Sequence, residues 1–141
     1  MNKTLKYKTA GAGVTITGAS DNMMLGKLVI PDKIDGKSVI CIGDEAFRDC
    51  TRLSSVTIPS SVTTISALAF FGCNGLISIT MLNGVRSIGS SAFQKCTGLT
   101  GITIPSSVKI ISDFAFQGCK GLTAKTIKAS PQIVAHILAQ V

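Results

Sequence analysis

The sequence predicts an α/β repeat solenoid, and three observations carry that prediction. Six kinds of residue recur every 23 positions, a segment near the start alternates as a strand hairpin does, and the final segment has the spacing of an amphipathic helix. The 141 residues are 45% hydrophobic and 15% charged, which excludes disorder driven by charge. One domain covering residues 1–141 is therefore expected.

The 23-residue period is the strongest of these signals. Four copies agree in six columns, so the period reflects the fold. The columns are Val39, Val62, Val85 and Val108; Ile42, Ile65, Ile88 and Ile111; Ala46, Ala69, Ala92 and Ala115; Phe47, Phe70, Phe93 and Phe116; Cys50, Cys73, Cys96 and Cys119; and Leu53, Leu76, Leu99 and Leu122. Stacked copies, with strands roughly 4.8 Å apart, bury each column and predict the core.

Each repeat is expected to hold a strand, a turn, a second extended piece and a compact Ala-Phe turn. The strands are predicted at residues 25–30, 53–58, 76–81, 99–104 and 122–127, with about five extra residues near 32–37 in the first copy. A 23-residue period lies in the range of leucine-rich repeats. Lys125 stands in an inward column otherwise held by aliphatic residues, so a slipped strand or an exposed edge is expected there.

Both ends of the array need covers, because a solenoid exposes core at its ends. Residues 1–24 are assigned to an N-terminal cap, residues 25–127 to the repeats and residues 128–141 to a C-terminal helical cap. In the first cap Val14 and Ile16 alternate as in a hairpin, and in the last Ser130 and Pro131 have the pattern of a helix start. The helix residues expected to face the last repeat are Ile133, Val134, Ile137, Leu138 and Val141.

These elements together define the expected architecture. It is a short right-handed leucine-rich repeat array with 23-residue repeats, a parallel β-sheet on one face, an N-terminal β-hairpin cap and a C-terminal helical cap.

Small polar residues lie between the inward columns of the strands and form the candidate binding surface on the concave strand face. The candidates are Ser55, Thr57, Ser78, Thr80, Thr100, Thr103, Thr123 and Thr126. One interpretation is that Thr simply suits exposed strand positions. The other is a flat docking surface that lets a partner's backbone or a glycan approach closely. The face lacks the aromatic and Arg residues in which binding surfaces are usually enriched.

The residues that usually carry chemistry do not form a catalytic pattern. His136 is the single histidine and no motif places an acid or nucleophile beside it. The five cysteines match no zinc spacing and are expected to form a buried thiol ladder. Asp44, Glu45 and Asp49 are expected to form a solvated turn in preference to a cation site. We therefore expect no enzyme, no cofactor or metal, and no small-molecule substrate.

Charge gives two further expectations. The formal net charge is +7, and residues 51–141 carry seven basic residues against one acidic residue, Asp113. Arg86 and Lys109 occupy equivalent positions in adjacent repeats, but no aromatic residue lies between them, so nucleic acid is a less favoured partner. No apolar run approaches about 18 residues, so membrane insertion is not expected. No apolar segment of signal-peptide length follows the first lysines, which leaves a cytoplasmic location open.

Short motifs within the repeats resemble those of BspA-like, or Treponema-type, leucine-rich repeats. They are Ile-Pro-Ser-Ser-Val at 58–62 and 104–108, Ile-Gly at 42–43 and 88–89, and the Ala-Phe-x-x-Cys element. The resemblance covers residues 25–127 and implies a noncatalytic, protein-binding module of a bacterial or protozoal adhesion protein. It also implies a cell-surface or secreted location and an extracellular-matrix or host surface protein as partner. A purely structural scaffold is the main alternative.

Overall fold

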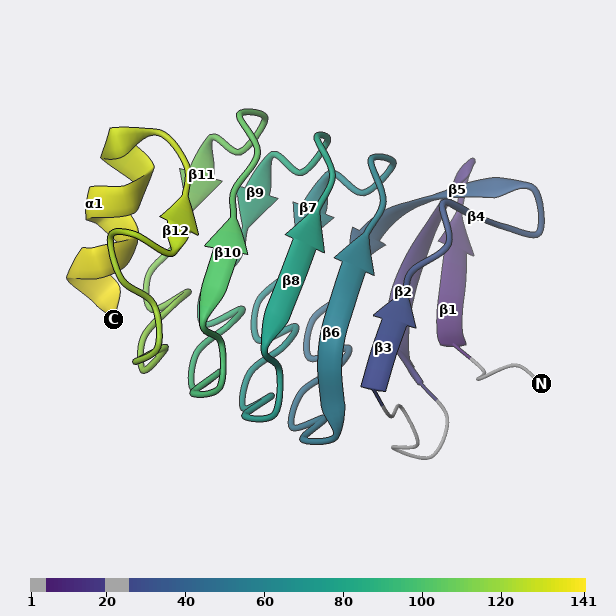
Figure 1. Ribbon diagram of the computed structural model, residues 1–141. Coiled ribbons are helices and arrows are strands. Elements are labelled where there is room, and N and C mark those ends of the chain that lie inside the picture. Colours follow the sequence, from purple (N-terminus) through teal and green to yellow (C-terminus); the bar gives the residue numbers. More distant parts are fainter. Residues whose placement is uncertain (1–4, 20–25) are drawn as a thin grey trace.

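The computed structural model describes residues 5–19 and 26–141, and these form a solenoid with one parallel sheet, one larger mixed sheet and one terminal helix (Figure 1). The five-stranded sheet contains β3 (Gly26–Val29), β6 (Leu53–Ile58), β8 (Ser78–Met81), β10 (Gly101–Thr103) and β12 (Ile127–Lys128). The larger sheet contains β1 (Leu5–Ala10), β2 (Gly13–Ala19), β4 (Lys33–Ile34), β5 (Lys37–Ile42), β7 (Thr64–Ile65), β9 (Ser87–Ile88) and β11 (Ile110–Ile111). The helix α1 is Pro131–Gln140. The predicted fold class is confirmed.

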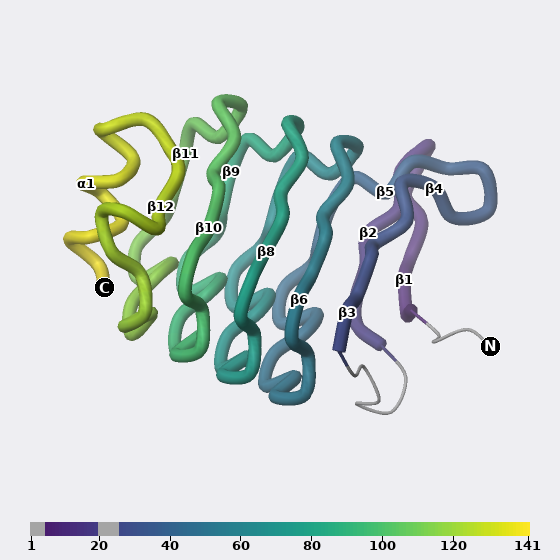
Figure 2. The backbone as a smooth tube through the Cα atoms, in the orientation of Figure 1, coloured from purple at the N-terminus to yellow at the C-terminus, as the bar shows by residue number. Residues whose placement is uncertain are grey.

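Each repeat makes one turn of the coil. The backbone passes from a strand of the five-stranded sheet through an upper loop to a strand of the larger sheet, and returns through a wider lower turn (Figure 2). Residues 23 apart are direct neighbours: Ser55 lies opposite Ser78, and Ser78 lies opposite Gly101. The sequence period is therefore the period of the strand register.

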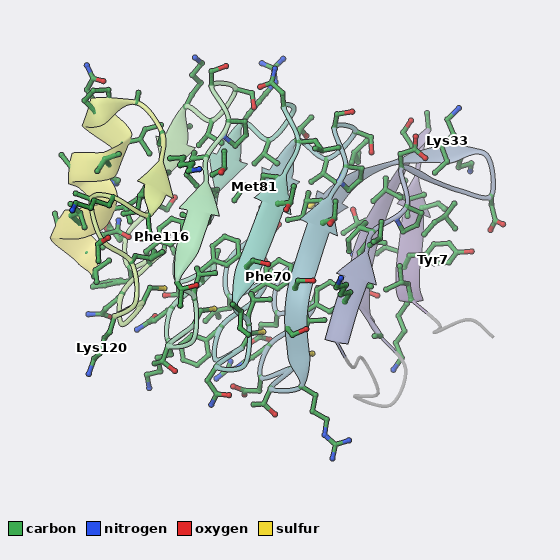
Figure 3. All side chains as sticks on the ribbon, viewed as in Figure 1. Tyr7, Lys33, Phe70, Met81, Phe116 and Lys120 are labelled. Carbon is green, nitrogen blue, oxygen red and sulfur yellow. The ribbon has the colours of Figure 1, made fainter. Side chains whose placement is uncertain are left out.

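The core between the sheets is a stack of identical side chains. Phe47, Phe70, Phe93 and Phe116 are fully buried, and successive ring centroids are 5.3 Å apart with interplanar angles of 13°, 4° and 16°. Figure 3 shows Phe70 and Phe116 inside the coil. Offset stacking of aromatic rings is favourable at this separation and adds to the burial of aliphatic columns on either side.

The lower turns contain left-handed residues at two recurring positions. In the first Ala-Phe turn these are Glu45 (φ 58°) and Asp49 (φ 59°), and equivalent residues in the next three turns also have positive φ. Three amides of this turn, those of Glu45, Phe47 and Asp49, donate to carbonyls of the following repeat. The same three bonds recur at the next two junctions, so the turns are linked in one direction along the array.

The predicted N-terminal hairpin is present, and it extends the larger sheet. β1 and β2 pair antiparallel, and β2 then pairs in parallel with β5, placing Val14 opposite Val39 and Ile16 opposite Ile42. The hairpin thus continues the aliphatic columns of the larger sheet. The parts of the predicted cap and first strand at residues 1–4 and 20–25, Leu25 included, lie outside the described residues.

The last strand differs from the prediction by a slip in register. The predicted strand at 122–127 is wrong: β12 is Ile127–Lys128, and Ile127 lies opposite Ile102. Lys125, which the period would place opposite Ile102, lies exposed in a turn. The slip buries an isoleucine at 3% exposure and leaves the ammonium group in water, which avoids the cost of burying an unpaired charge. Of the two expectations for Lys125, the slipped strand is the one observed.

The helix α1 lies at the opposite end of the coil from the hairpin (Figure 1). Ser130 caps it by accepting the Ile133 N–H, and Pro131 occupies the first turn, as the sequence indicated. Ile137 is fully buried and Ile133 and Val134 are half-buried. Leu138 and Val141 are more exposed than expected, at 37% and 38%.

Candidate functional site

The outward side of the five-stranded sheet carries two rows of small residues, which we call the strand face. One row is Ser55, Ser78 and Gly101, and the other is Thr57, Thr80 and Thr103, with members of each row directly opposite one another on β6, β8 and β10. The intervening residues Val56, Ile79 and Ile102 are buried, so alternation along the strands turns the hydroxyl groups outward.

Charged and apolar residues bound the two rows. Lys27 lies opposite Ser55 and Val29 lies opposite Thr57, while Lys128 lies opposite Thr103 at the other end. Val29 is 68% exposed, and Ile77, which precedes β8, is 54% exposed. The middle of the strand face is therefore uncharged and rich in hydroxyl groups, with an ammonium group at each end.

Two predicted site residues do not join these rows. The slip of β12 puts Lys128, and not Thr126, opposite Thr103. Thr123 and Thr126 lie in the turn before β12, where the Thr123 N–H donates to Oγ1 of Thr126 at 2.9 Å. Thr100 is exposed just before β10, and its N–H donates to the Ile77 carbonyl at 3.2 Å. Of the four threonines spaced one period apart, Thr57, Thr80, Thr103 and Thr126, only the first three therefore lie in one row.

The strand face can form many weak polar contacts. Each hydroxyl group both donates and accepts, so the rows can match a peptide backbone or a sugar. Because the side chains are short, a partner can approach the sheet closely.

Four of the five cysteines form a ladder inside the coil, whereas Cys41 lies half-buried in β5 and does not join it. The thiols of Cys73, Cys96 and Cys119 are buried and donate to the carbonyls of Phe47, Phe70 and Phe93 at 3.0, 3.2 and 3.1 Å. Burial, as the largest cause, raises the pKa of Cys73 to about 12. A thiol held protonated in this way is a poor nucleophile and a poor metal ligand, and the residues described contain no group of three or more candidate ligands.

Cys50, the first member of the same column, is only half-buried. Burial and the nearby Asp49 carboxylate raise the pKa of its thiol as well. The ladder is therefore dry in its last three rungs and partly open in its first.

His136 and the acidic turn are both engaged in local contacts. Nε2 of His136 lies 3.1 Å from the Ile111 carbonyl, which ties α1 to β11. In the first lower turn Arg48 pairs with Glu45 at 2.6 Å and with Asp49 at 3.6 Å. Arg48 thus offsets the charge of two of the three acidic residues in this turn, Glu45 and Asp49.

Sequence reasoning missed a groove of about 560 Å³ on the lower edge of the coil, which we call the turn-edge groove. It is lined by residues of several successive lower turns, chiefly Asp49, Phe71, Asn74, Lys95, Thr97 and Lys120. Its sequence signal is a break in the period: Phe71 stands where the other repeats have Arg48, Gln94 and Gln117. Only the fold shows that these positions share an edge.

Within residues 5–19 and 26–141, no helix has the length and apolar character needed to cross a bilayer.

Comparisons with known proteins place this architecture in a family. The model of the BspA type leucine rich repeat region matches residues 21–137, in six copies. Among curated proteins, no significant match was found.

Three solved structures share the fold. A leucine rich repeat protein of T. pallidum has a TM-score of 0.80 and 35% identity over 84% of this chain and 56% of its own. A leucine rich cell surface protein of Faecalibacterium prausnitzii has a TM-score of 0.69 and 31% identity over 83% of this chain and 35% of its own. One from Bacteroides capillosus has a TM-score of 0.74 and 26% identity over 91% of this chain and 95% of its own.

The chain thus spans about half the length of the T. pallidum protein and about a third of the F. prausnitzii protein. Because the family model covers most of the sequence and its repeats coincide with the observed coils, the chain belongs to the BspA-type leucine-rich repeat family.

Proposed function

We propose that this chain is a noncatalytic protein-binding module of a surface adhesion protein, and that it binds through the strand face. The observation that carries the proposal is the pair of rows on β6, β8 and β10, five hydroxyl side chains and Gly101, which lie in register on a rigid sheet. A rigid surface loses little conformational entropy when a partner binds. The partner class we favour is an extracellular-matrix or host surface protein.

Two features of the strand face support this proposal. Exposed Val29 and Ile77 supply apolar contact beside the hydroxyl rows, as mixed binding surfaces do. Lys27 and Lys128 bound the rows, so charge acts at the rim, where it guides association more than it adds affinity. The location follows from the same proposal: the module acts at the cell surface or after secretion.

The test uses three lysine substitutions in one row of the strand face. The variant Thr57→Lys, Thr80→Lys and Thr103→Lys places long charged side chains where a partner would dock, so binding to an immobilised panel of extracellular-matrix proteins should fall at least tenfold. Surface plasmon resonance measures this directly. Circular dichroism before and after substitution verifies that the fold is retained.

A matched variant controls for the added charge. Ser60→Lys, Ser90→Lys and Ser106→Lys adds the same three charges at exposed positions away from the sheet, and it should bind as the parent chain does. If both variants bind equally well, the strand face is not the contact surface. If binding collapses with salt and DNA competes for it, the chain is a nucleic-acid binder and the proposal fails.

A further inference from the structure

We infer that the turn-edge groove is a second binding site and that it takes a carboxylated sugar, such as a uronic acid unit of a polysaccharide. The groove has a volume of about 560 Å³ and crosses successive repeats on the lower edge, away from the strand face (Figure 3, where Lys120 is labelled). Its lining combines positive charge, an aromatic ring, and neutral donors and acceptors. Each of these three features restricts the chemistry of the occupant.

The charge of the groove favours an anion. Lys95 and Lys120 line it, and among the described residues neither forms an ion pair. Asp49 also lines the groove, but its carboxylate lies 3.6 Å from Arg48, which offsets its charge. The unpaired ammonium groups therefore give the groove a net attraction for a carboxylate, which can accept charge-assisted hydrogen bonds from them.

The aromatic ring favours an occupant with an apolar face. Phe71 is half-buried, and two cations lie near its ring, with Arg48 Cζ at 4.9 Å and Lys95 Nζ at 5.5 Å from the centroid. These contacts hold the lysine beside the ring. The exposed part of the ring supplies an apolar wall that the C–H face of a sugar can pack against, as apolar linings do in other ligand sites.

The remaining groups favour a ligand that carries hydroxyls. Asp49 accepts hydrogen bonds, while Asn74 and Thr97 both donate and accept. A purely cationic lining would suit phosphate, and an acidic peptide would offer fewer hydroxyl groups to Asp49 and Asn74. A saccharide satisfies all the groups at once, because its hydroxyls address Asp49 and Asn74 while its carboxylate reaches the lysines.

The backbone beside the groove carries a glycine at every second repeat. Gly72 and Gly118 alternate with Asp49 and Lys95 at one position of the repeat. The Asp49 carboxylate lies where a Gly72 side chain would be, whereas the nearest atoms to a Cβ at Gly118 would be those of Lys95, 3.5 Å away. Both glycines have left-handed φ values, 76° and 81°. Since Lys95 adopts the same conformation with a side chain present, φ 64°, the glycines are not required by the turn alone.

The test is an NMR titration of the full chain with trigalacturonic acid, using its methyl ester as the neutral ligand of the same shape. We expect amide shifts confined to the lower turns that hold Asp49, Phe71, Asn74, Lys95, Thr97 and Lys120, and weak, millimolar binding. The methyl ester should bind at least three times more weakly. Equal affinity for acid and ester, or shifts that lie outside these turns, would overturn the inference.

Variants separate the site from general electrostatic attraction. Lys95→Gln with Lys120→Gln should weaken binding about three- to tenfold, since exposed ion pairs are individually modest. Phe71→Ala should also weaken it. Lys33→Gln with Lys109→Gln removes the same charge at exposed positions away from the groove and should have no effect. An equal loss in this control would show that charge alone accounts for binding and would refute the site. The triple strand-face variant should retain sugar binding, which keeps this inference distinct from the proposed function.

Discussion

A phenylalanine ring at position 70 lies between two others, each 5.3 Å away, and is completely buried. A second phenylalanine of the same sequence, Phe114, is 55% exposed and has a left-handed φ of 64°. The two residues share a chemical type but differ in burial. Substituting each of them in turn therefore measures how much the stacked phenylalanines contribute to the free energy of unfolding.

We expect Phe70→Ala to lower the free energy of unfolding by about 3–5 kcal/mol, because it removes both stacking contacts and leaves a cavity. Phe114→Ala should change it by less than about 1 kcal/mol, since an exposed side chain leaves no cavity. Urea denaturation followed by circular dichroism measures both. Comparable losses in the two variants would mean that the stack does not dominate the core.

Individual residues also show which features a sequence pattern can predict and which it cannot. The phenylalanine column was predictable because identical residues recur at one period. The left-handed conformations of Leu68 and Phe114 were not, because neither residue type favours positive φ. The turn-edge groove was missed for a related reason: its residues break the period, and their proximity depends on how the turns stack.

At the scale of elements, the helix α1 completes the hydrogen bonding of the last lower turn. The Phe116 N–H has no following repeat to which it can donate, and it donates instead to Oε1 of Gln140 at 2.9 Å. Nε2 of the same side chain donates to the Ser112 carbonyl at 3.1 Å. One glutamine side chain thus replaces a piece of the backbone of a missing repeat.

Gln140→Ala is expected to lower the free energy of unfolding by about 1–3 kcal/mol, because it leaves a buried N–H without a partner. Gln132→Ala, an exposed position of the same helix, gains the same helix propensity and should be nearly neutral. Urea denaturation gives the energies, and hydrogen exchange of the Phe116 amide should accelerate only in the first variant. Unchanged exchange there would argue against the capping role.

The last strand shows where an element's position could not be predicted. The sequence placed it at 122–127 by extending the period, and Lys125 indicated a disturbance without giving its size. Two registers of the last strand are possible: one keeps the 23-residue period and buries Lys125, and the other shifts by two residues and buries Ile127. Tertiary packing favours the shifted register, because burial of the side chain outweighs the local sequence pattern.

At the scale of the whole molecule, the stability of a repeat array is approximately the sum of the stability of each repeat and of the interfaces between neighbouring repeats. Removal of one full period, residues 76–98, joins Gly75 to Leu99 and preserves every register relation, with Phe116 following Phe70 in the stack. We expect this shortened chain to fold cooperatively with a lower melting temperature, as seen by circular dichroism and size-exclusion chromatography.

Removal of residues 76–94 is the matched deletion that breaks the period. It takes out nearly as much chain but shifts each column against its neighbour, so no cooperative transition is expected. If the two deletions melt alike, the register between repeats is not what specifies the fold.

The forward direction of the hydrogen bonds between lower turns has a consequence for how such a protein can grow. Every turn leaves its own amides in need of acceptors on the downstream side, and in the last turn Gln140 supplies one of them. New copies of the repeat can therefore be inserted upstream of Ser112, and α1 can still cap the last repeat in the same way. Copies added after α1 would leave this helix between repeats, where it would interrupt their stacking. We therefore expect such a protein to lengthen by duplication of repeats within the chain.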